Sequence, residues 1–219
     1  MRKKTQEAGK GPDAKTAEGS RKRSGTRIDH PIPPLYDGAC TRLILGSFPS
    51  VKSREAGFFY GHPQNRFWKV MAGVFKDDVP RTVPEKRDFL LRHHVAVWDV
   101  IASCEIAGSS DASIKNARAN DLSRILAEAP IRTIFVNGKT AEKLYLKHIL
   151  PVTGQPCVCL PSTSPANAAW SPERLTATWR ELLGAEEGAA TEQSRSFHGA
   201  EESCRLPKTN GETIREDHR

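Results

Sequence analysis

Residues 41–50 read Thr-Arg-Leu-Ile-Leu-Gly-Ser-Phe-Pro-Ser, and residues 157–167 read Cys-Val-Cys-Leu-Pro-Ser-Thr-Ser-Pro-Ala-Asn. In each stretch an apolar run is followed at once by a loop of small and polar residues. Short continuous apolar runs are typical of strands that are buried on both faces of a parallel sheet. Because the carboxyl ends of parallel strands meet at one edge of the sheet, we expect both loops to line the same crevice.

Apolar runs and helical periodicity alternate along the middle of the chain. The pattern predicts strands over residues 41–46, 95–101, 131–136 and 157–160. It predicts helices over residues 66–75, 87–94, 121–129, 139–150 and 171–183. Alternating strands and helices favour a parallel sheet that is covered on both faces. We therefore predict a three-layer α/β/α sandwich with a central, mainly parallel four-stranded sheet.

Composition divides the chain into three parts. Residues 1–37 are rich in Lys, Arg, Gly, Ser and Thr and end in a Pro-rich lead-in, so we expect a disordered basic arm. Residues 184–219 are polar and lack a regular period, which predicts a disordered tail. The remaining residues, 38–183, have the size of one ordinary domain. We expect this domain to carry the function.

The formal net charge of +7 is uneven along the chain. Residues 1–30 carry nine Lys and Arg against four Asp and Glu, which gives +5, while residues 184–219 carry −3. The middle of the chain therefore also carries +5. A basic arm on a basic domain favours a polyanionic partner, most simply a nucleic acid, although surface charge also serves solubility alone.

The five cysteines show neither a CxxC pair nor a zinc-ligand spacing, so we expect buried thiols and no metal. No stretch resembles a signal peptide or is apolar over the ~18 residues that a membrane span needs. We therefore expect no membrane association, and a cytoplasmic protein that lies with the nucleoid and has no targeting signal. We also expect a monomer.

Three motifs together resemble the uracil-DNA glycosylase superfamily. They are GSFPS at residues 46–50, FFYGHPQNRFW at residues 58–68 and LPSTSPANA at residues 160–168. The combination is closest to the hypoxanthine-DNA glycosylase branch, and HPxNRFW is also similar to the mismatch-specific uracil/thymine branch. The resemblance covers about residues 41–183.

The resemblance implies an enzyme that flips a deaminated base out of DNA and hydrolyses its N-glycosidic bond. The product would be an abasic site, and no cofactor is implied. No lysine is placed to form a Schiff base, so we expect base release without strand cleavage. The four spaced cysteines that hold an iron–sulfur cluster in some branches are absent, so we expect no cluster.

The resemblance assigns the catalytic role to Asn65, which would orient the attacking water. In the mismatch-specific branch a first-loop Asn has this role, but Phe48 stands at its position here. The simpler interpretation is that Asn65 caps the following helix, which Asn does well; both roles can coexist. Asp99, at the end of a predicted strand, is the second candidate for water activation, and it could instead bind backbone N–H groups.

By resemblance and position, other residues line the base pocket or contact DNA. Tyr60 would stack on the flipped base, and Phe48 would wall the pocket. For the base pocket we expect Gly46, Ser47, Phe48, Tyr60 and Asn137. For DNA binding we expect Ser50, His62, Ser162, Thr163, Ser164 and Asn167. Some of the neighbouring cations should meet phosphates: Lys52, Arg54, Arg66, Lys69 and Lys139. Asn167 or residues 168–170 would fill the gap in the duplex.

Three alternatives remain open. The same chemistry could act on uracil or a mismatched pyrimidine, against which stands Phe48 in the first loop. The chain could bind nucleic acid without catalysis, in which case damaged and intact DNA would bind equally. It could cleave free nucleosides, in which case activity on inosine would not depend on salt as DNA binding does.

Overall fold

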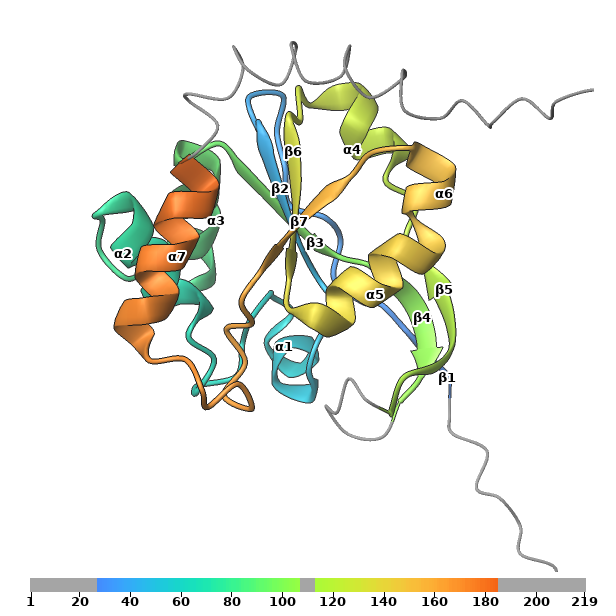
Figure 1. Cartoon of the computed structure of the whole chain (residues 1–219), viewed down its shortest axis with the longest axis horizontal. Helices are drawn as coiled ribbons and strands as arrows, with labels where there is room; N and C mark the ends of the chain where they lie inside the picture. The colour runs from blue at the N-terminus through green and yellow to red at the C-terminus, as the bar shows by residue number, and fades with distance from the viewer. Residues whose placement is uncertain (1–26, 107–112, 185–219) are drawn as a thin grey trace, which may run out of the picture.

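The structure, a computed structural model, describes residues 27–106 and 113–184. The fold has a central sheet between two layers of helices, and a second, smaller sheet beside it (Figure 1). The predicted three-layer α/β/α sandwich is therefore confirmed. Residues 1–26 and most of the predicted tail, residues 185–219, lie outside the described residues.

The central sheet has four parallel strands in the order β3-β2-β6-β7. Its strands are β2 (Arg42–Gly46), β3 (Val95–Asp99), β6 (Thr133–Asn137) and β7 (Cys157–Leu160). The chain runs from β2 to β3 on one side, and then crosses to β6 on the other side. The strand order therefore changes direction between β2 and β6, which is called a topological switch point. Ligand crevices form outside the carboxyl ends of the strands at such a point.

Successive side chains of a strand point to opposite faces of the sheet, so a hydrophobic core lies on each face. Ile44 packs against α2 (Phe67–Phe75), α3 (Val83–Arg92) and α7 (Pro172–Gly184). Leu43 and Leu45 point to the opposite core, with α4 (Ser123–Glu128) and α5 (Lys139–His148). The short helices α1 (Val51–Ala56) and α6 (Leu150–Thr153) complete the fold. In Figure 1 the two helical layers flank the sheet on opposite sides.

The second sheet is antiparallel, in the order β1-β4-β5, and was not predicted. It contains β1 (Arg27–Asp29), β4 (Ile101–Glu105) and β5 (Lys115–Ala119). The strand predicted over residues 95–101 is therefore wrong at its end, because the chain leaves the central sheet at Val100. There the Val100 N–H donates to the Gly46 carbonyl and the Val100 carbonyl accepts from Asn120 N–H, at 2.8 Å each.

Residues 27–37 belong to the fold, which corrects the predicted domain start at residue 38. β1 pairs with β4, and Leu35 forms a bridge with Val97. Ile32 and Leu35 are buried in the core beside α3 and α7. The basic composition of the preceding residues hid these few well-spaced apolar side chains.

Two features hold for residues 27–106 and 113–184, which the structure describes. Within these ranges, every helix is too short or too polar to cross a membrane. Within the same ranges, no three His, Cys, Asp or Glu side chains come together as metal ligands would.

Candidate active site

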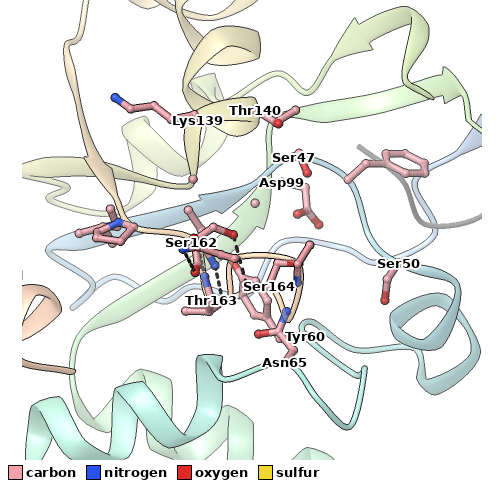
Figure 2. Close-up of a pocket in the computed structure, with 18 of the residues that line it drawn as sticks. Ser47, Ser50, Tyr60, Asn65, Asp99, Lys139, Thr140, Ser162, Thr163 and Ser164 are labelled. Carbon is pink, nitrogen blue, oxygen red and sulfur yellow. Dashed lines mark hydrogen bonds between the residues drawn. The ribbon is translucent and has the colours of Figure 1, made fainter. Parts of the chain in front are cut away.

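A cavity of about 710 Å³ opens at the carboxyl edge of the central sheet, at the switch point between β2 and β6. Pockets for small ligands commonly have volumes of roughly 300–1,000 Å³. Residues at or just after the ends of all four strands of the sheet line the cavity, together with Phe59, Tyr60 and Asn65 from the segment between α1 and α2. Figure 2 shows side chains from these separate segments around one hollow.

The first loop, residues 46–50, forms one wall. Gly46, Ser47, Phe48 and Ser50 all line the cavity, as expected for a pocket loop. Ser47 and Phe48 are buried, and the Phe48 ring meets the His30 ring edge-on at 5.8 Å. Ser50 is the N-cap of α1, because its hydroxyl accepts from the Ser53 N–H at 3.2 Å. A contact of Ser50 with DNA remains a prediction.

Gly46 is required by a close approach of Asp99. The two residues face each other in the register of β2 and β3. A Cβ atom at residue 46 would lie 2.2 Å from Asp99 Oδ1, well inside van der Waals contact. Any other residue at this position would therefore displace the Asp99 carboxylate, which His30 holds in place.

Asn65 lines the cavity and also caps a helix, so the two interpretations of this residue coexist in position. Its Oδ1 accepts from the Phe67 N–H at 2.9 Å, at the start of α2. Asn65 N–H in turn donates to the His62 carbonyl at 2.9 Å. His62 is not among the residues that line the cavity, and its Nδ1 accepts from the Gln64 N–H at 3.2 Å. His62 therefore shapes the turn that presents Asn65.

Tyr60 lies flat against Phe67, with ring centroids 3.7 Å apart and an interplanar angle of 14°. The residue lines the cavity and its backbone adopts a positive φ of 52°, which is uncommon for a bulky side chain. A ring that is backed by a buried Phe67 can offer its other face as a stacking surface. This geometry is compatible with the predicted role of Tyr60, which no contact in the structure tests.

Asn137 and Thr163 hold the second loop, residues 161–167, to the end of β6. Asn137 Nδ2 donates to Thr163 Oγ1 at 2.9 Å, and Thr163 N–H donates to Asn137 Oδ1 at 3.0 Å. Thr163 is 0% exposed. The Thr163 hydroxyl faces inward and is bonded to Asn137, and a contact of this residue with DNA remains a prediction. Asn137 lines the cavity, but its amide positions this loop rather than standing free to read a base.

The remaining polar residues of the second loop line the cavity mouth and bind one another. Ser162 Oγ accepts from Ser164 N–H at 3.2 Å, and Ser164 Oγ accepts from Ala166 N–H at 3.3 Å. Asn167 Nδ2 donates to the Ser162 carbonyl at 2.9 Å. These contacts stabilise the loop (Figure 2), and contacts of the three side chains with DNA remain predictions.

Arg66 binds the backbone of the second loop, a role that the sequence did not indicate. Its guanidinium donates to the carbonyls of Ser164 at 2.7 Å and Asn167 at 2.9 Å, and also to that of Trp170. Its backbone N–H donates to the Thr163 carbonyl at 3.1 Å. Arg66 was expected among cations that could meet phosphates, but its donors are directed at this loop.

Asp99 lies at the end of β3 and is paired with His30. His30 Nε2 lies 2.8 Å from Asp99 Oδ2, and the two side chains are 3% and 7% exposed. Asp99 lines the cavity, where Figure 2 places it near Ser47. Sequence reasoning missed His30 because it falls in the segment that was predicted to be disordered. The signal that could have found it is the apolar spacing of Ile28, Ile32 and Leu35 around it.

Two ionisable side chains at the β6–β7 side of the cavity have shifted pKa values. Burial raises the pKa of the Cys159 thiol, so the group stays protonated and is a poor nucleophile. A hydrogen bond from Lys139 Nζ to Glu142, at 2.8 Å, raises the pKa of that lysine. Lys52 is likewise paired at the surface, with Glu55 at 2.7 Å.

Comparison with known proteins places the chain in a family. The sequence profile of the Uracil DNA glycosylase superfamily matches residues 33–183. A hypoxanthine DNA glycosylase of Methanosarcina acetivorans is 32% identical over 149 residues, which cover 67% of this chain and 93% of that protein. A hypoxanthine DNA glycosylase of Methanosarcina barkeri is 31% identical over 138 residues, which cover 62% of this chain and 86% of that protein.

A solved structure agrees with these matches. The solution NMR structure of a candidate uracil DNA glycosylase from Methanosarcina acetivorans superposes with a TM-score of 0.58 and 30% identity. The match covers 69% of this chain and 96% of that one. It follows from the matched profile, the relatives and the shared fold that this chain belongs to the uracil DNA glycosylase superfamily.

Proposed function

We propose that this enzyme is a monofunctional DNA glycosylase that removes hypoxanthine from DNA and leaves an abasic site. The observation that carries the proposal is the cavity of about 710 Å³ at the switch point, where the first loop, Asn65 and the second loop meet. The relatives that are 32% and 31% identical to this chain over the aligned residues are named hypoxanthine DNA glycosylases. The proposal extends their activity to this chain.

A base must leave the duplex before its glycosidic bond can be reached, which costs a few kcal/mol and least for a weakened pair. Tyr60 is placed to offset part of this cost, because stacking on an aromatic ring contributes about 1–3 kcal/mol per base. Its contact with Phe67 holds the ring in place before DNA arrives. Stacking suits a purine, which has the larger flat surface.

Hydrolysis then needs a water molecule held at the sugar. We assign this role to Asn65, because its Oδ1 already accepts from Phe67 N–H and its side chain is thereby fixed at the cavity wall. An amide offers two donors and a further lone pair for a water. The Phe48 side chain, in the first loop, supplies a buried apolar wall and no hydrogen bond.

The second loop and the neighbouring first loop would hold the DNA backbone beside the flipped nucleotide. Ser50, Ser162, Ser164 and Asn167 all lie at the cavity, and hydroxyl and backbone N–H groups fix the register of DNA without reading its sequence. We expect the enzyme to act as a monomer. Chromosomal DNA as substrate would place the enzyme with the nucleoid in the cytoplasm.

The test uses the full chain, EDTA and end-labelled duplexes that carry one hypoxanthine or one uracil. Alkali after the reaction reveals abasic sites. We expect a break at hypoxanthine only after alkali, and none before it. A break at uracil alone would favour the pyrimidine alternative, and binding of all duplexes with no break would favour a non-catalytic module.

A further inference from the structure

His30 and Asp99 form a buried polar pair at the wall of the proposed base pocket, where Asp99 lines the cavity and His30 lies behind it. His30 Nε2 and Asp99 Oδ2 lie 2.8 Å apart. The imidazole is enclosed by aromatic rings, with centroids 5.8 Å from Phe48, 6.5 Å from Phe59 and 6.2 Å from Trp98. Buried polar groups are costly unless they are hydrogen-bonded. We therefore consider the hydrogen-bonding capacity of each atom of this pair.

The backbone fixes which nitrogen of His30 carries the proton. The Ile32 N–H donates to His30 Nδ1 at 3.2 Å, so Nδ1 is an acceptor and carries no proton. The proton of the neutral imidazole therefore lies on Nε2, which donates to Asp99 Oδ2. One carboxylate oxygen is thus permanently occupied.

The other oxygen is left for the cavity. Asp99 Oδ1 lies so close to Gly46 that a Cβ there would come within 2.2 Å of it. Within residues 27–106 and 113–184, no donor is bound to Oδ1, and Asp99 lines the cavity. A carboxylate oxygen can only accept hydrogen bonds. A ligand in the cavity must therefore place a hydrogen-bond donor opposite Asp99 Oδ1.

We propose that Asp99 Oδ1 reads the ring N–H of the flipped base, and that His30 is the positioning residue that aims it. The inference rests on the proposed function and names its selectivity. Deamination of adenine turns N1 from a bare acceptor into an N–H donor. Asp99 would bind N1–H of hypoxanthine and repel the N1 lone pair of adenine. The normal base is thereby rejected.

The pairing with His30 also limits what Asp99 can bind. A free carboxylate could accept both the N1–H and the 2-amino group of guanine side by side. With Oδ2 occupied by His30, one oxygen remains for one N–H, which suits hypoxanthine. A site built around a buried hydrogen bond rejects a ligand that lacks the partner group strongly, because the site group is left unpaired.

The decisive variant is Asp99→Asn. His30 Nε2–H still needs an acceptor, so the new amide oxygen must face His30 and its NH₂ must face the cavity. That donor opposes N1–H of hypoxanthine but suits the bare N1 of unsubstituted purine. We measure single-turnover release of both bases from otherwise identical DNA. We expect D99N to lower hypoxanthine release about 10²-fold and to change purine release by less than about threefold.

A matched pair elsewhere in the chain provides the control. Asp77 Oδ2 lies 2.9 Å from His93 Nε2, away from the residues that line the cavity. D77N should leave the hypoxanthine-to-purine ratio unchanged. If D99N slows both bases equally, Asp99 acts in the chemical step and the inference is overturned, while the proposed function stands. If the unaltered chain releases no hypoxanthine, the proposed function itself fails.

A second measurement needs no variant. Free hypoxanthine should inhibit the unaltered chain at least about tenfold more strongly than 1-methylhypoxanthine, which lacks the N–H. Equal inhibition by both bases would contradict the reading role.

The role of His30 is tested by two substitutions. In His30→Gln the new amide can still donate to Asp99 and should keep the hypoxanthine-to-purine ratio, whereas in His30→Phe the side chain cannot donate and the ratio should fall. An unchanged ratio in H30F would remove His30 from the account.

Discussion

Asn137 and Thr163 bind each other through two reciprocal hydrogen bonds, of 2.9 and 3.0 Å, across the ends of two neighbouring strands. The pair joins the end of β6 to the loop after β7, so the sheet edge itself sets the position of the second loop. Polar residues at strand ends are easily interpreted as ligand contacts. Here they hold the loop that makes the cavity.

The pair predicts the effect of removing one partner. Thr163→Val replaces a buried hydroxyl and leaves Asn137 Nδ2 without its acceptor, which costs about 1–3 kcal/mol. We expect denaturant unfolding to show this loss. Thr163→Ser keeps the hydroxyl and serves as the control. Equal stability of the two variants would show that the bond contributes nothing.

Arg66 should act through geometry rather than charge. Its guanidinium reaches the carbonyls of Ser164, Asn167 and Trp170 at once, which the single ammonium of lysine cannot do. We expect R66K to weaken binding of hypoxanthine DNA by about tenfold or more, nearly as much as R66A. The measurement is a DNA titration at several salt concentrations.

The salt dependence separates the two roles of Arg66. If Arg66 contacted a phosphate, its loss would reduce the slope of log affinity against log salt concentration by about one. Because Arg66 faces the loop, we expect an unchanged slope. Arg124→Lys, at an exposed ion pair with Glu128, is the control. Full affinity in R66K with loss only in R66A would instead indicate a charge effect.

Gly46→Ala should disable the site with little change elsewhere. The new Cβ would lie 2.2 Å from Asp99 Oδ1, so the carboxylate must leave its position. We expect single-turnover excision of hypoxanthine to fall at least about 10²-fold, the scale of losing one preorganised polar contact. Gly184→Ala, where a Cβ would meet nothing within 4 Å, should keep the full rate. A normal rate in G46A would refute the close packing of these two residues.

The basic arm should contribute to affinity but not to chemistry. Deletion of residues 1–26 removes eight Lys and Arg against three Asp and Glu. We expect weaker DNA binding and a smaller salt slope, with an unchanged single-turnover rate at saturation. Deletion of residues 1–35 also removes His30 and the buried Ile32 and Leu35, so it should unfold the protein at a lower temperature. A short deletion that abolishes the chemical step would contradict this division.

Asp77 predicts how stability depends on acid. Hydrogen bonds from Arg92 and then His93 lower the pKa of Asp77 below its ordinary value. A carboxyl group with a lowered folded-state pKa contributes stability above its unfolded pKa of about 3.9 and loses it below. The unfolding midpoint of the unaltered chain should therefore exceed that of D77N at pH 7, and the difference should shrink at pH 3. A constant difference would rule out this linkage.

The central sheet could be predicted because a buried parallel strand is recognisable as a short apolar run in the sequence. Residues 42–46 and 157–160 are short apolar runs that end at small-residue loops, and both are central-sheet strands. β5 has no such run, since Lys-Asn-Ala-Arg-Ala lies at the exposed edge of the small sheet. The sheet β1-β4-β5 was therefore missed.

The site was only partly predictable for a different reason. The composition of the two loops predicted their place at the site, but the partners of Arg66 and Asp99 are distant in sequence. Arg66 binds carbonyls, which every residue has, so no residue type signals the contact. His30 pairs with Asp99 across 69 positions, and only the folded chain brings them together. Contacts of this kind follow from topology rather than from a motif.

The most direct test of the central claim detects the released base itself. Full-length enzyme in excess, with EDTA present, is mixed with a duplex that carries one hypoxanthine, and free base is followed by liquid chromatography and mass spectrometry. We expect one free hypoxanthine per duplex, and a rate lower by about 10²–10³-fold for Asn65→Ala. No free hypoxanthine from the unaltered chain, or equal rates for the two proteins, would contradict the account.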